Sequence, residues 1–419
     1  MLRLKSIRID KLRKVQPGTV LNFTGDTNLV LGKNGVGKTT LLDVIACAAK
    51  LEFSAFENEE IDVTVELNDG DGLLPAARIL EAHVRHKRVE KEQSLVDSIR
   101  PGNSHSIEVA INIVVSLSSS KFEMAIANNK ITVTEGAAQL GDFDGGYNFA
   151  IIVRTFSETS DLLAKLARDG ELKIFRSIFW LLVDRITHSR IDESLDTVRA
   201  GMAVPVDITL HGPNQTEIKR LALNDLSLAL MASVNADSEQ LSATSSEVEF
   251  LREFAKLVDA DLVKTIYSRR SREEVGDALL LTFHDQNFSI QRGQSVTYFN
   301  QFSYGQKRLL AILQYLAVNK EIVVADEITN GLHHEWIEFI VKKLEGRQCF
   351  LTSQNPVLLD FLTFTSAAET KNRLIRCERG ADGMLIWRNL TDQEANDFYT
   401  SYETGMQHVG EIMLKQGLW

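Results

Sequence analysis

Short alternations of hydrophobic and polar positions predict β-strands along the first third of the chain. The strands predicted in this way are residues 4–9, 20–21, 28–31, 60–66, 107–136 (a meander of several strands) and 149–155. Residues 39–50 carry apolar side chains at helical spacing and predict a helix directly after the strand at 28–31. The strongly charged residues 77–99 are also predicted to be helical.

The middle of the chain, residues 158–270, has mostly helical spacing. Residues 173–189 are dense in apolar and aromatic side chains and predict a buried helix, and residues 217–234 predict a second helix. Residues 246–249 resemble a capping box that opens a third helix. The apolar side chains of this third helix are Leu251, Phe254, Val258 and Leu262. The second and third helices are predicted to form a short antiparallel hairpin.

Strands and helices alternate after residue 278. The predicted strands are 278–283, 295–299, 321–325 and 349–352, and the predicted helices are 303–318, 333–344 and 357–361. Such alternation is typical of a parallel α/β sheet. We therefore predict an α/β fold whose core is built from both ends of the chain, residues 1–155 and 278–419. Residues 156–277 are predicted to be a mostly helical inserted subdomain.

Composition places the chain among ordinary globular proteins. Hydrophobic residues make up 44% and charged residues 25% of its 419 positions. The net charge is −11, from 46 basic and 57 acidic residues, which excludes a protein that coats nucleic acid indiscriminately. The three scattered cysteines predict buried thiols in a reducing compartment. Without an apolar signal core or a run of about 18 apolar residues, a cytoplasmic location is expected.

The segment 32–39 fits the phosphate-loop pattern G-x-x-x-x-G-K-[ST]. Glycines let the backbone N–H groups wrap closely around a polyphosphate, and the helix that follows points its positive end at the anion. Lys38 supplies a charge to the β- and γ-phosphates, and Thr39 offers its hydroxyl to Mg²⁺. The residues expected to bind ATP here are Asn34, Gly35, Gly37, Lys38, Thr39 and Thr40.

A second motif lies at the end of the apolar run 321–325, where Asp326 and Glu327 follow directly. The carboxyl end of a buried parallel strand opens at the nucleotide crevice. Asp326 is therefore expected to hold Mg²⁺, and Glu327 to act as the general base that polarises the attacking water.

The segment Ser303-Tyr304-Gly305-Gln306 begins a predicted helix. Ser303 is a good N-cap, and the segment also resembles the signature motif of ABC-type ATPases. This resemblance implies that Ser303, Gly305 and Gln306 of one copy contact the γ-phosphate bound to another copy. It therefore implies ATP hydrolysis at composite sites of a head-to-tail dimer or a larger homo-oligomer.

Two further elements extend the resemblance. Residues 330–333, Asn-Gly-Leu-His, stand where ABC-type ATPases have their D-loop, and this version is similar to that of RecF- and SMC-like ATPases. Residues 352–356 stand where the family has its switch histidine, but Gln354 occupies that position. Glutamine can donate a hydrogen bond to the γ-phosphate but cannot carry a proton, so we expect ATP hydrolysis to be slow. The residues expected to catalyse it are Lys38, Glu327 and Gln354.

In size and motif layout the chain also resembles the single-chain ATPases of bacterial anti-phage systems. This implies a nucleotide-dependent sensor or scaffold that controls a separate effector, such as a TOPRIM nuclease, and that answers to a phage-encoded trigger protein. The alternative is a RecF-like ATPase of DNA repair or replication, with DNA as partner. The basic clusters 85–88 and 269–272 would then grip DNA, or else be solvated surface. No membrane partner is expected.

Overall fold

The computed structural model describes residues 2–51, 53–56, 58–69, 77–90, 105–117, 121–127, 130–135, 138–144, 190–191, 206–211, 215–219, 224–353, 358, 360–404 and 408–417. The chain forms two compact units. Unit 1 lies within residues 1–190, 321–326 and 344–419, and unit 2 lies within residues 191–320 and 327–343. The two ends of the chain thus share unit 1, and one of the four boundaries between the units falls between Asp326 and Glu327.

The five-stranded sheet of unit 1, here called sheet B, carries the phosphate loop. Its strands in spatial order are β16 (Ile322–Ala325), β17 (Gln348–Leu351), β3 (Thr27–Leu31), β18 (Leu374–Arg379) and β19 (Leu385–Asn389). The first four run parallel, and β19 is antiparallel at the edge. Every residue of β16 and β17 is buried, which explains their nearly continuous apolar sequence.

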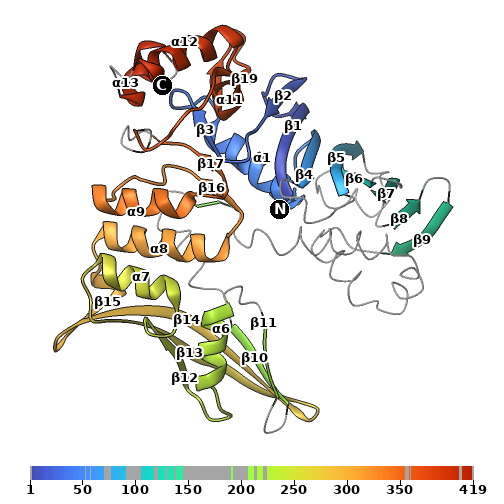
Figure 1. Cartoon of the computed structure of the whole chain (residues 1–419). Helices are drawn as coiled ribbons and strands as arrows, with labels where there is room; N and C mark the ends of the chain where they lie inside the picture. The colour runs from blue at the N-terminus through green and yellow to red at the C-terminus, as the bar shows by residue number, and fades with distance from the viewer. Residues whose placement is uncertain are drawn as a thin grey trace, which may run out of the picture. The chain divides into compact units, whose positions relative to one another are not determined.

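Helix α1 (Lys38–Lys50) follows β3 and packs against β16, β17 and the first strand of the chain (Figure 1). Its side chains from Leu41 to Ala49, apart from Asp43, are buried. A parallel sheet with a strand, a glycine-rich loop and a helix in succession confirms the predicted α/β P-loop fold.

An eight-stranded antiparallel sheet, sheet A, completes the β-structure of unit 1. Its strands in spatial order are β2 (Thr19–Asn22), β1 (Leu2–Leu12), β4 (Ile61–Asp69), β5 (Ala77–Glu90), β6 (His105–Leu117), β7 (Lys121–Ala127), β8 (Lys130–Glu135) and β9 (Ala138–Asp144). The predicted strands at 60–66 and 107–136 are confirmed. The strand predicted at 149–155 lies outside the described residues.

The predicted helix at 77–99 is wrong, because residues 77–90 form β5. Ala82, Val84 and His86 are buried while the residues between them are more exposed, so burial follows the two-residue period of a strand. Glu81, Arg85 and Lys87, which contributed to the helical interpretation, are exposed on the other face of β5.

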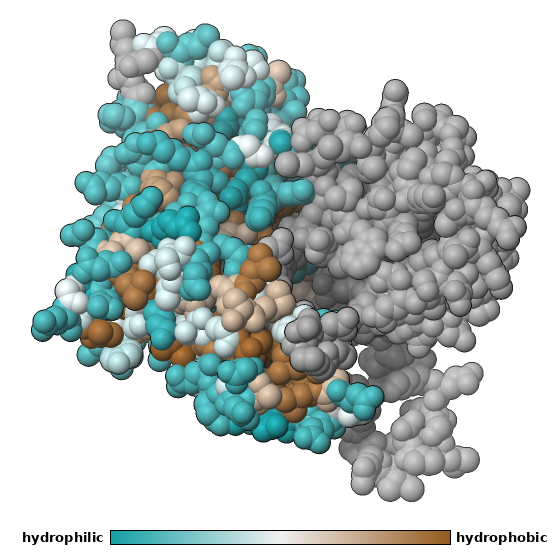
Figure 2. All heavy atoms as spheres, turned by 60° about the horizontal axis from the view of Figure 1, so that its bottom comes forward, coloured by the Kyte–Doolittle hydropathy of each residue, from teal (hydrophilic) through white to brown (hydrophobic). Residues whose placement is uncertain are grey.

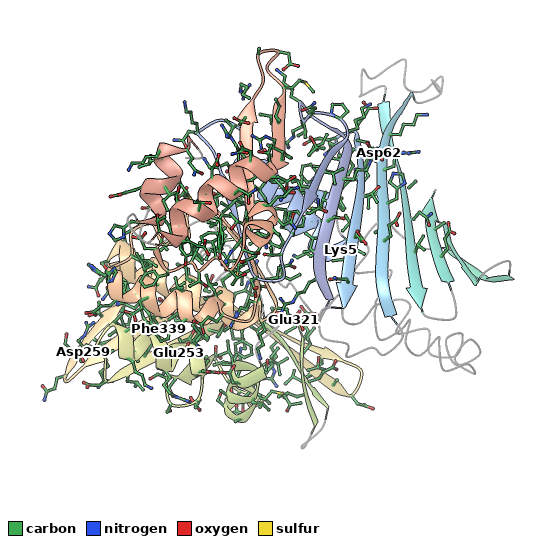
Figure 3. The ribbon with its side chains drawn as sticks, turned by 45° about the horizontal axis from the view of Figure 1, so that its top comes forward. Lys5, Asp62, Glu253, Asp259, Glu321 and Phe339 are labelled. Carbon is green, nitrogen blue, oxygen red and sulfur yellow. The ribbon has the colours of Figure 1, made fainter. Side chains whose placement is uncertain are left out.

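Part of the basic cluster at 85–88 is neutralised within sheet A. Asp62 of β4 lies 2.6 Å from His83 Nε2 and 2.9 Å from Arg85 Nε of β5. Burial alone would raise the pKa of Asp62, but these two hydrogen bonds outweigh it and lower that pKa. Figure 3 shows Asp62 and Lys5 on this sheet, where Lys5 Nζ pairs with Glu66 at 2.7 Å.

Three helices close the C-terminal end of unit 1: α11 (Ala367–Arg373), α12 (Asp392–Glu403) and α13 (Val409–Lys415). A 3-10 turn, η1 (Ser54–Phe56), follows α1. Phe398 of α12 stacks edge-on against Phe364, and Ile412 and Met413 of α13 are buried. Phe398, Ile412 and Met413 therefore pack on the core of their own unit, whereas Leu414 is 65% exposed.

Unit 2 is built on a third sheet, sheet C, which is antiparallel. Its strands in spatial order are β11 (Gln215–Lys219), β10 (Val206–His211), β14 (Ala278–Arg292), β13 (Leu262–Val275) and β12 (Gln240–Thr244), and β15 (Ser295–Tyr298) also pairs with β14. The strands predicted at 278–283 and 295–299 are confirmed as β14 and β15.

The helices of unit 2 are α6 (Asn224–Ser233), α7 (Glu249–Leu257), α8 (Tyr304–Val318) and α9 (His334–Leu344), with the 3-10 turn η3 (Phe299–Gln301) before α8. Helices α7 and α8 pack side by side (Figure 1). Lys343 of α9 pairs with Glu253 of α7 and lies 5.8 Å from the ring centre of Phe339, and Figure 3 shows these two partners. The predicted helices at 303–318 and 333–344 are confirmed.

The second and third predicted helices are confirmed in part as α6 and α7, but both are shorter than predicted and the helical hairpin itself is wrong. Residues 217–219 belong to β11, and Leu262, taken as the end of the third helix, is the first residue of β13. Helix α7 starts after Val248, which has no capping side chain, and ends at Leu257 just before Asp259, whose φ is 52°. A left-handed residue stops a helix, and the β-branched and aromatic residues that follow favour a strand. The helix predicted at 173–189 lies outside the described residues.

None of the helices within the described ranges is both long and apolar enough to cross a membrane. Figure 2 shows teal residues over much of the described surface, with brown residues gathered in its lower part. Among the large apolar side chains that remain exposed are Leu228 of α6, Val296 and Tyr298.

Candidate nucleotide site

The phosphate loop joins β3 to α1 through backbone conformations that require glycine. Gly32, Gly35 and Gly37 have φ values of 140°, 81° and 84°. A Cβ on Gly32 would overlap the carbonyl oxygen of Cys377, and one on Gly37 would lie 2.9 Å from Leu385 Cδ1. The loop is therefore glycine-rich both for its left-handed turns and for its close contact with β18 and β19.

Two side chains from those strands fix the loop's carbonyl groups. The Trp387 indole Nε1 donates to the Val36 carbonyl at 3.2 Å, and Arg379 Nη2 donates to the Gly35 carbonyl at 2.8 Å. Trp387 is buried. With their carbonyls held on the strand side, the loop's N–H groups are left to line the concave side, as in an anion-binding nest.

Lys38 and Thr39 begin α1, with the left-handed Gly37 as N-cap and no acidic residue in the first turn. Lys38 Nζ donates to the carbonyl oxygens of Gly32 and Lys33 at 2.8 and 3.1 Å, so its charge lies inside the loop. The positive end of the helix and this ammonium group together favour a polyphosphate. Thr40 is the next residue of the same first turn.

Asp326 follows β16 and meets Thr39, as the sequence predicts. Thr39 Oγ1 donates to Asp326 Oδ2 at 2.7 Å, and the Thr352 hydroxyl, at the end of β17, donates to Oδ1. Mg²⁺ in nucleotide sites takes one or two carboxylates together with phosphate oxygens, so this hydroxyl and carboxylate fit the ion. Within the described ranges no cluster of three or more His, Cys, Asp or Glu side chains offers a different kind of metal site.

Sequence reasoning missed two charged residues beside Asp326. Arg190 Nη1 lies 3.1 Å from Asp326 Oδ2, and Arg190 Nε lies 2.9 Å from Asp43 Oδ1 on α1. Burial raises the pKa of Asp43, and the charge of Arg190 works against that rise. No local pattern points to this contact, because 136 positions separate Arg190 from Asp326.

The signature segment opens α8 in unit 2. Ser303 is its N-cap and accepts a hydrogen bond from the Gln306 N–H at 3.2 Å, while the Gln306 side chain accepts one from the Ser303 N–H at 2.9 Å. This is a complete capping box. Gly305 comes so close to Gly331 that a Cβ would lie 3.0 Å from the Gly331 carbonyl oxygen. The signature segment and the predicted D-loop are thus in contact within unit 2.

Glu327 opens the D-loop segment with φ at 52°, an unusual conformation for a residue with a side chain. Its carbonyl oxygen accepts from Arg308 Nη2 at 2.9 Å and from the Asn330 N–H at 3.1 Å. Arg308 belongs to α8 and is fully buried. The signature helix therefore holds the backbone of Glu327, a link that the sequence alone did not predict.

Gln354, predicted at the switch position, lies outside the described residues.

Among the other predicted site residues, the structure brings Thr39 and Asp326 together in unit 1, next to Lys38 and the loop glycines. It brings Ser303, Gly305 and Gln306 together with the D-loop in unit 2.

Comparisons with known proteins agree with the phosphate-loop fold. A family model described as "AAA domain" matches residues 6–160, and one described as "AAA domain, putative AbiEii toxin, Type IV TA system" matches residues 170–360. The first match spans the phosphate loop, and the second spans Ser303, Asp326 and Glu327. No curated protein is similar enough to count as a match.

Solved structures similar to this chain include SMC head domains. The head domain from Thermotoga maritima is 11% identical with a TM-score of 0.37, covering 93% of this chain and 99% of its own. A head bound to the C-winged helix domain of ScpA is 12% identical with a TM-score of 0.38, covering 94% and 99%. At such scores the likeness decides nothing by itself. The two AAA-domain matches, together with the phosphate loop and Asp326, support an ATPase of the AAA class.

Proposed function

We propose that this chain binds and hydrolyses ATP with Mg²⁺. The observation that carries the proposal is the 2.7 Å contact between Thr39 of the phosphate loop and Asp326 at the end of β16. These are the hydroxyl and the carboxylate that such a site needs for the ion, and they come from segments far apart in the sequence. When bound, Mg²⁺ would neutralise charge on the β- and γ-phosphates.

The chain's own residues divide the remaining work. The loop N–H groups from Asn34 to Thr40 and the Lys38 ammonium bind the phosphates. Glu327 takes a proton from the attacking water as general base. Gln354 orients the γ-phosphate without taking a proton, so we expect turnover to be slow.

A second copy of the chain completes this site in the proposal. Ser303, Gly305 and Gln306 lie at the exposed start of α8, and an ATP bound to one copy would meet them from a partner copy. The capping box supports this assignment because it holds Ser303 in place without covering it. The expected assembly is a head-to-tail dimer or a larger homo-oligomer.

We propose further that the nucleotide state controls a separate effector in anti-phage defence, such as a TOPRIM nuclease, after a phage-encoded trigger protein acts. In length and motif layout the chain resembles AriA, the ATPase of the PARIS anti-phage system. The family model that matches residues 170–360 names a toxin–antitoxin system, which is also a cellular control system with two components.

The RecF-like alternative, in which the chain itself binds DNA, has less support. Arg269 pairs with Glu239, Arg272 lies 3.6 Å from Asp237, and Arg85 pairs with Asp62. Ion pairs within the chain reduce the positive field that a phosphate backbone needs.

The test is ATP hydrolysis by the full chain as wild type, Glu327→Gln and Glu335→Gln, with and without duplex DNA. Glu335 is the matched control, because it lies eight residues on, at the start of α9. We expect slow hydrolysis by wild type and Glu335→Gln, and a loss of about 100-fold or more in Glu327→Gln. Equal rates in all three would overturn the assignment of Glu327, and strong stimulation by DNA would favour the RecF-like alternative.

A further inference from the structure

Arg190 reaches the candidate metal carboxylate from outside every sequence motif. Its guanidinium joins two acidic groups of unit 1, Asp326 after β16 and Asp43 on α1. The side chains of Arg190 and Asp326 are only 18% and 15% exposed, so solvent and salt screen this pair less than a surface pair.

One carboxylate oxygen is shared between two groups. Asp326 Oδ2 accepts from Thr39 Oγ1 at 2.7 Å and from Arg190 Nη1 at 3.1 Å. The hydroxyl and this oxygen are the groups expected to face Mg²⁺. The guanidinium therefore compensates the same negative charge that the ion would compensate, and two cations compete for one carboxylate.

We infer that Arg190 competes with Mg²⁺ for Asp326. Arg190 thereby sets the Mg²⁺ concentration that the nucleotide site needs to bind ATP. This inference rests on the proposed Mg–ATP function. Before the ion binds, Arg190 keeps the buried carboxylate neutralised and oriented. When Mg–ATP binds, the Arg190 contact to Asp326 is exchanged for the ion.

Asp43 lowers the free-energy cost of losing the contact between Arg190 and Asp326. Arg190 is bonded to Asp43 through Nε and to Asp326 through Nη1, so one contact can be lost while the other remains. Arg190 then stays in unit 1 beside α1, with its charge still paired. A lysine, whose ammonium is a single point charge, cannot reproduce the two-sided contact.

The test measures how much Mg²⁺ the full chain needs to bind ATP. Mant-ATP fluorescence and the thermal midpoint with ATP are each recorded across a Mg²⁺ titration for wild type, Arg190→Ala, Arg190→Lys and Arg376→Ala. Arg376 is the matched control, since it also bridges two carboxylates, Glu394 and Glu378 at 2.8 and 2.7 Å, in unit 1. Neither readout requires turnover.

We expect the half-saturating Mg²⁺ concentration to fall by about threefold to tenfold in Arg190→Ala, by less in Arg190→Lys, and not at all in Arg376→Ala. If Arg190→Ala does not fold, Arg190→Lys alone decides, and an unchanged requirement in it overturns the inference. An unchanged or increased requirement in a folded Arg190→Ala that binds mant-ATP also overturns it and leaves the ATPase proposal standing. Absence of Mg²⁺-dependent binding in wild type would overturn the ATPase proposal itself.

Discussion

The phosphate-loop end of unit 1 and the signature end of unit 2 hold their polar groups in opposite ways. In unit 1, Asp326 accepts hydrogen bonds from Thr39, Thr352 and Arg190 and is mostly buried. In unit 2, Ser303 and Tyr304 are exposed, and the hydrogen bonds of Ser303 to Gln306 and Lys307 stay within one helical turn. The first region satisfies its carboxylate from within its own unit. The second region keeps its capped helix start at the surface, which agrees with the proposed composite site.

The largest effect should come from Gly32, where the first region tolerates no side chain. Gly32→Ala is expected to destabilise the protein by about 3 kcal/mol or more, because the residue has φ 140° and a Cβ would overlap the Cys377 carbonyl. Gly346 has φ 75° with open space around it, so Gly346→Ala should cost about 1 kcal/mol. Urea unfolding of both variants measures the difference, and equal losses would contradict a tightly packed phosphate loop.

In the same region, a substitution of Lys38 is expected to weaken ATP binding while leaving the folding stability almost unchanged. Lys38→Ala is expected to weaken mant-ATP binding about 100-fold, since the ammonium inside the loop is lost, while stability changes little. Lys33→Ala is the control. Lys33 belongs to the same loop, and it contacts Lys38 through its backbone carbonyl, which the substitution keeps. Titration of both variants with mant-ATP checks this, and similar affinities would place the phosphates elsewhere.

These two regions were also unequally predictable. The phosphate loop and the strand before Asp326 were predicted correctly, because glycine spacing and a continuous apolar run are local signals. So was the capped start of α8, from Ser303. Strand β5 and the strands β10 to β13 of sheet C were not, because the charges of residues 77–90 were interpreted as helical and the helical spacing of Leu251, Phe254 and Val258 continues to Leu262, which already begins β13.

Contacts between distant segments leave no local signal at all. Arg190 meets Asp326 across 136 positions, and Arg308 meets the Glu327 carbonyl only because α8 packs beneath the turn. Both are arginines among many in the chain. Nothing in their neighbouring residues distinguishes them, so these two contacts could be found only from the folded structure.

Ser303 offers a sharper contrast, since it has both a structural and a proposed functional role. Ser303→Ala should cost about 1 kcal/mol of stability through the lost cap. Thr391→Ala removes the equivalent cap of α12, which also has a complete capping box, and should cost the same. Only Ser303→Ala is expected to slow ATP hydrolysis as well, by about tenfold or more. Equal hydrolysis by the two variants would reduce Ser303 to a helix cap.

The smallest effect concerns acid stability, and it again separates the two units. The Arg388 hydrogen bond leads the contacts that lower the pKa of Glu394, in unit 1, from 4.5 to about 2. A depressed carboxyl pKa contributes stability above pH 4.5, and that contribution is lost as the pH falls toward 2. Glu394→Gln should therefore flatten the fall in unfolding free energy over this range, by about 1 kcal/mol or less for so exposed a pair. In unit 2 the pKa of Glu338 is also lowered, through its hydrogen bond to Lys342, but the side chains of Glu338 and Lys342 are 46% and 67% exposed. Urea unfolding from pH 5 to 2.5 compares the two. A larger change in Glu338→Gln than in Glu394→Gln would contradict the expectation that solvent screening weakens the more exposed pair.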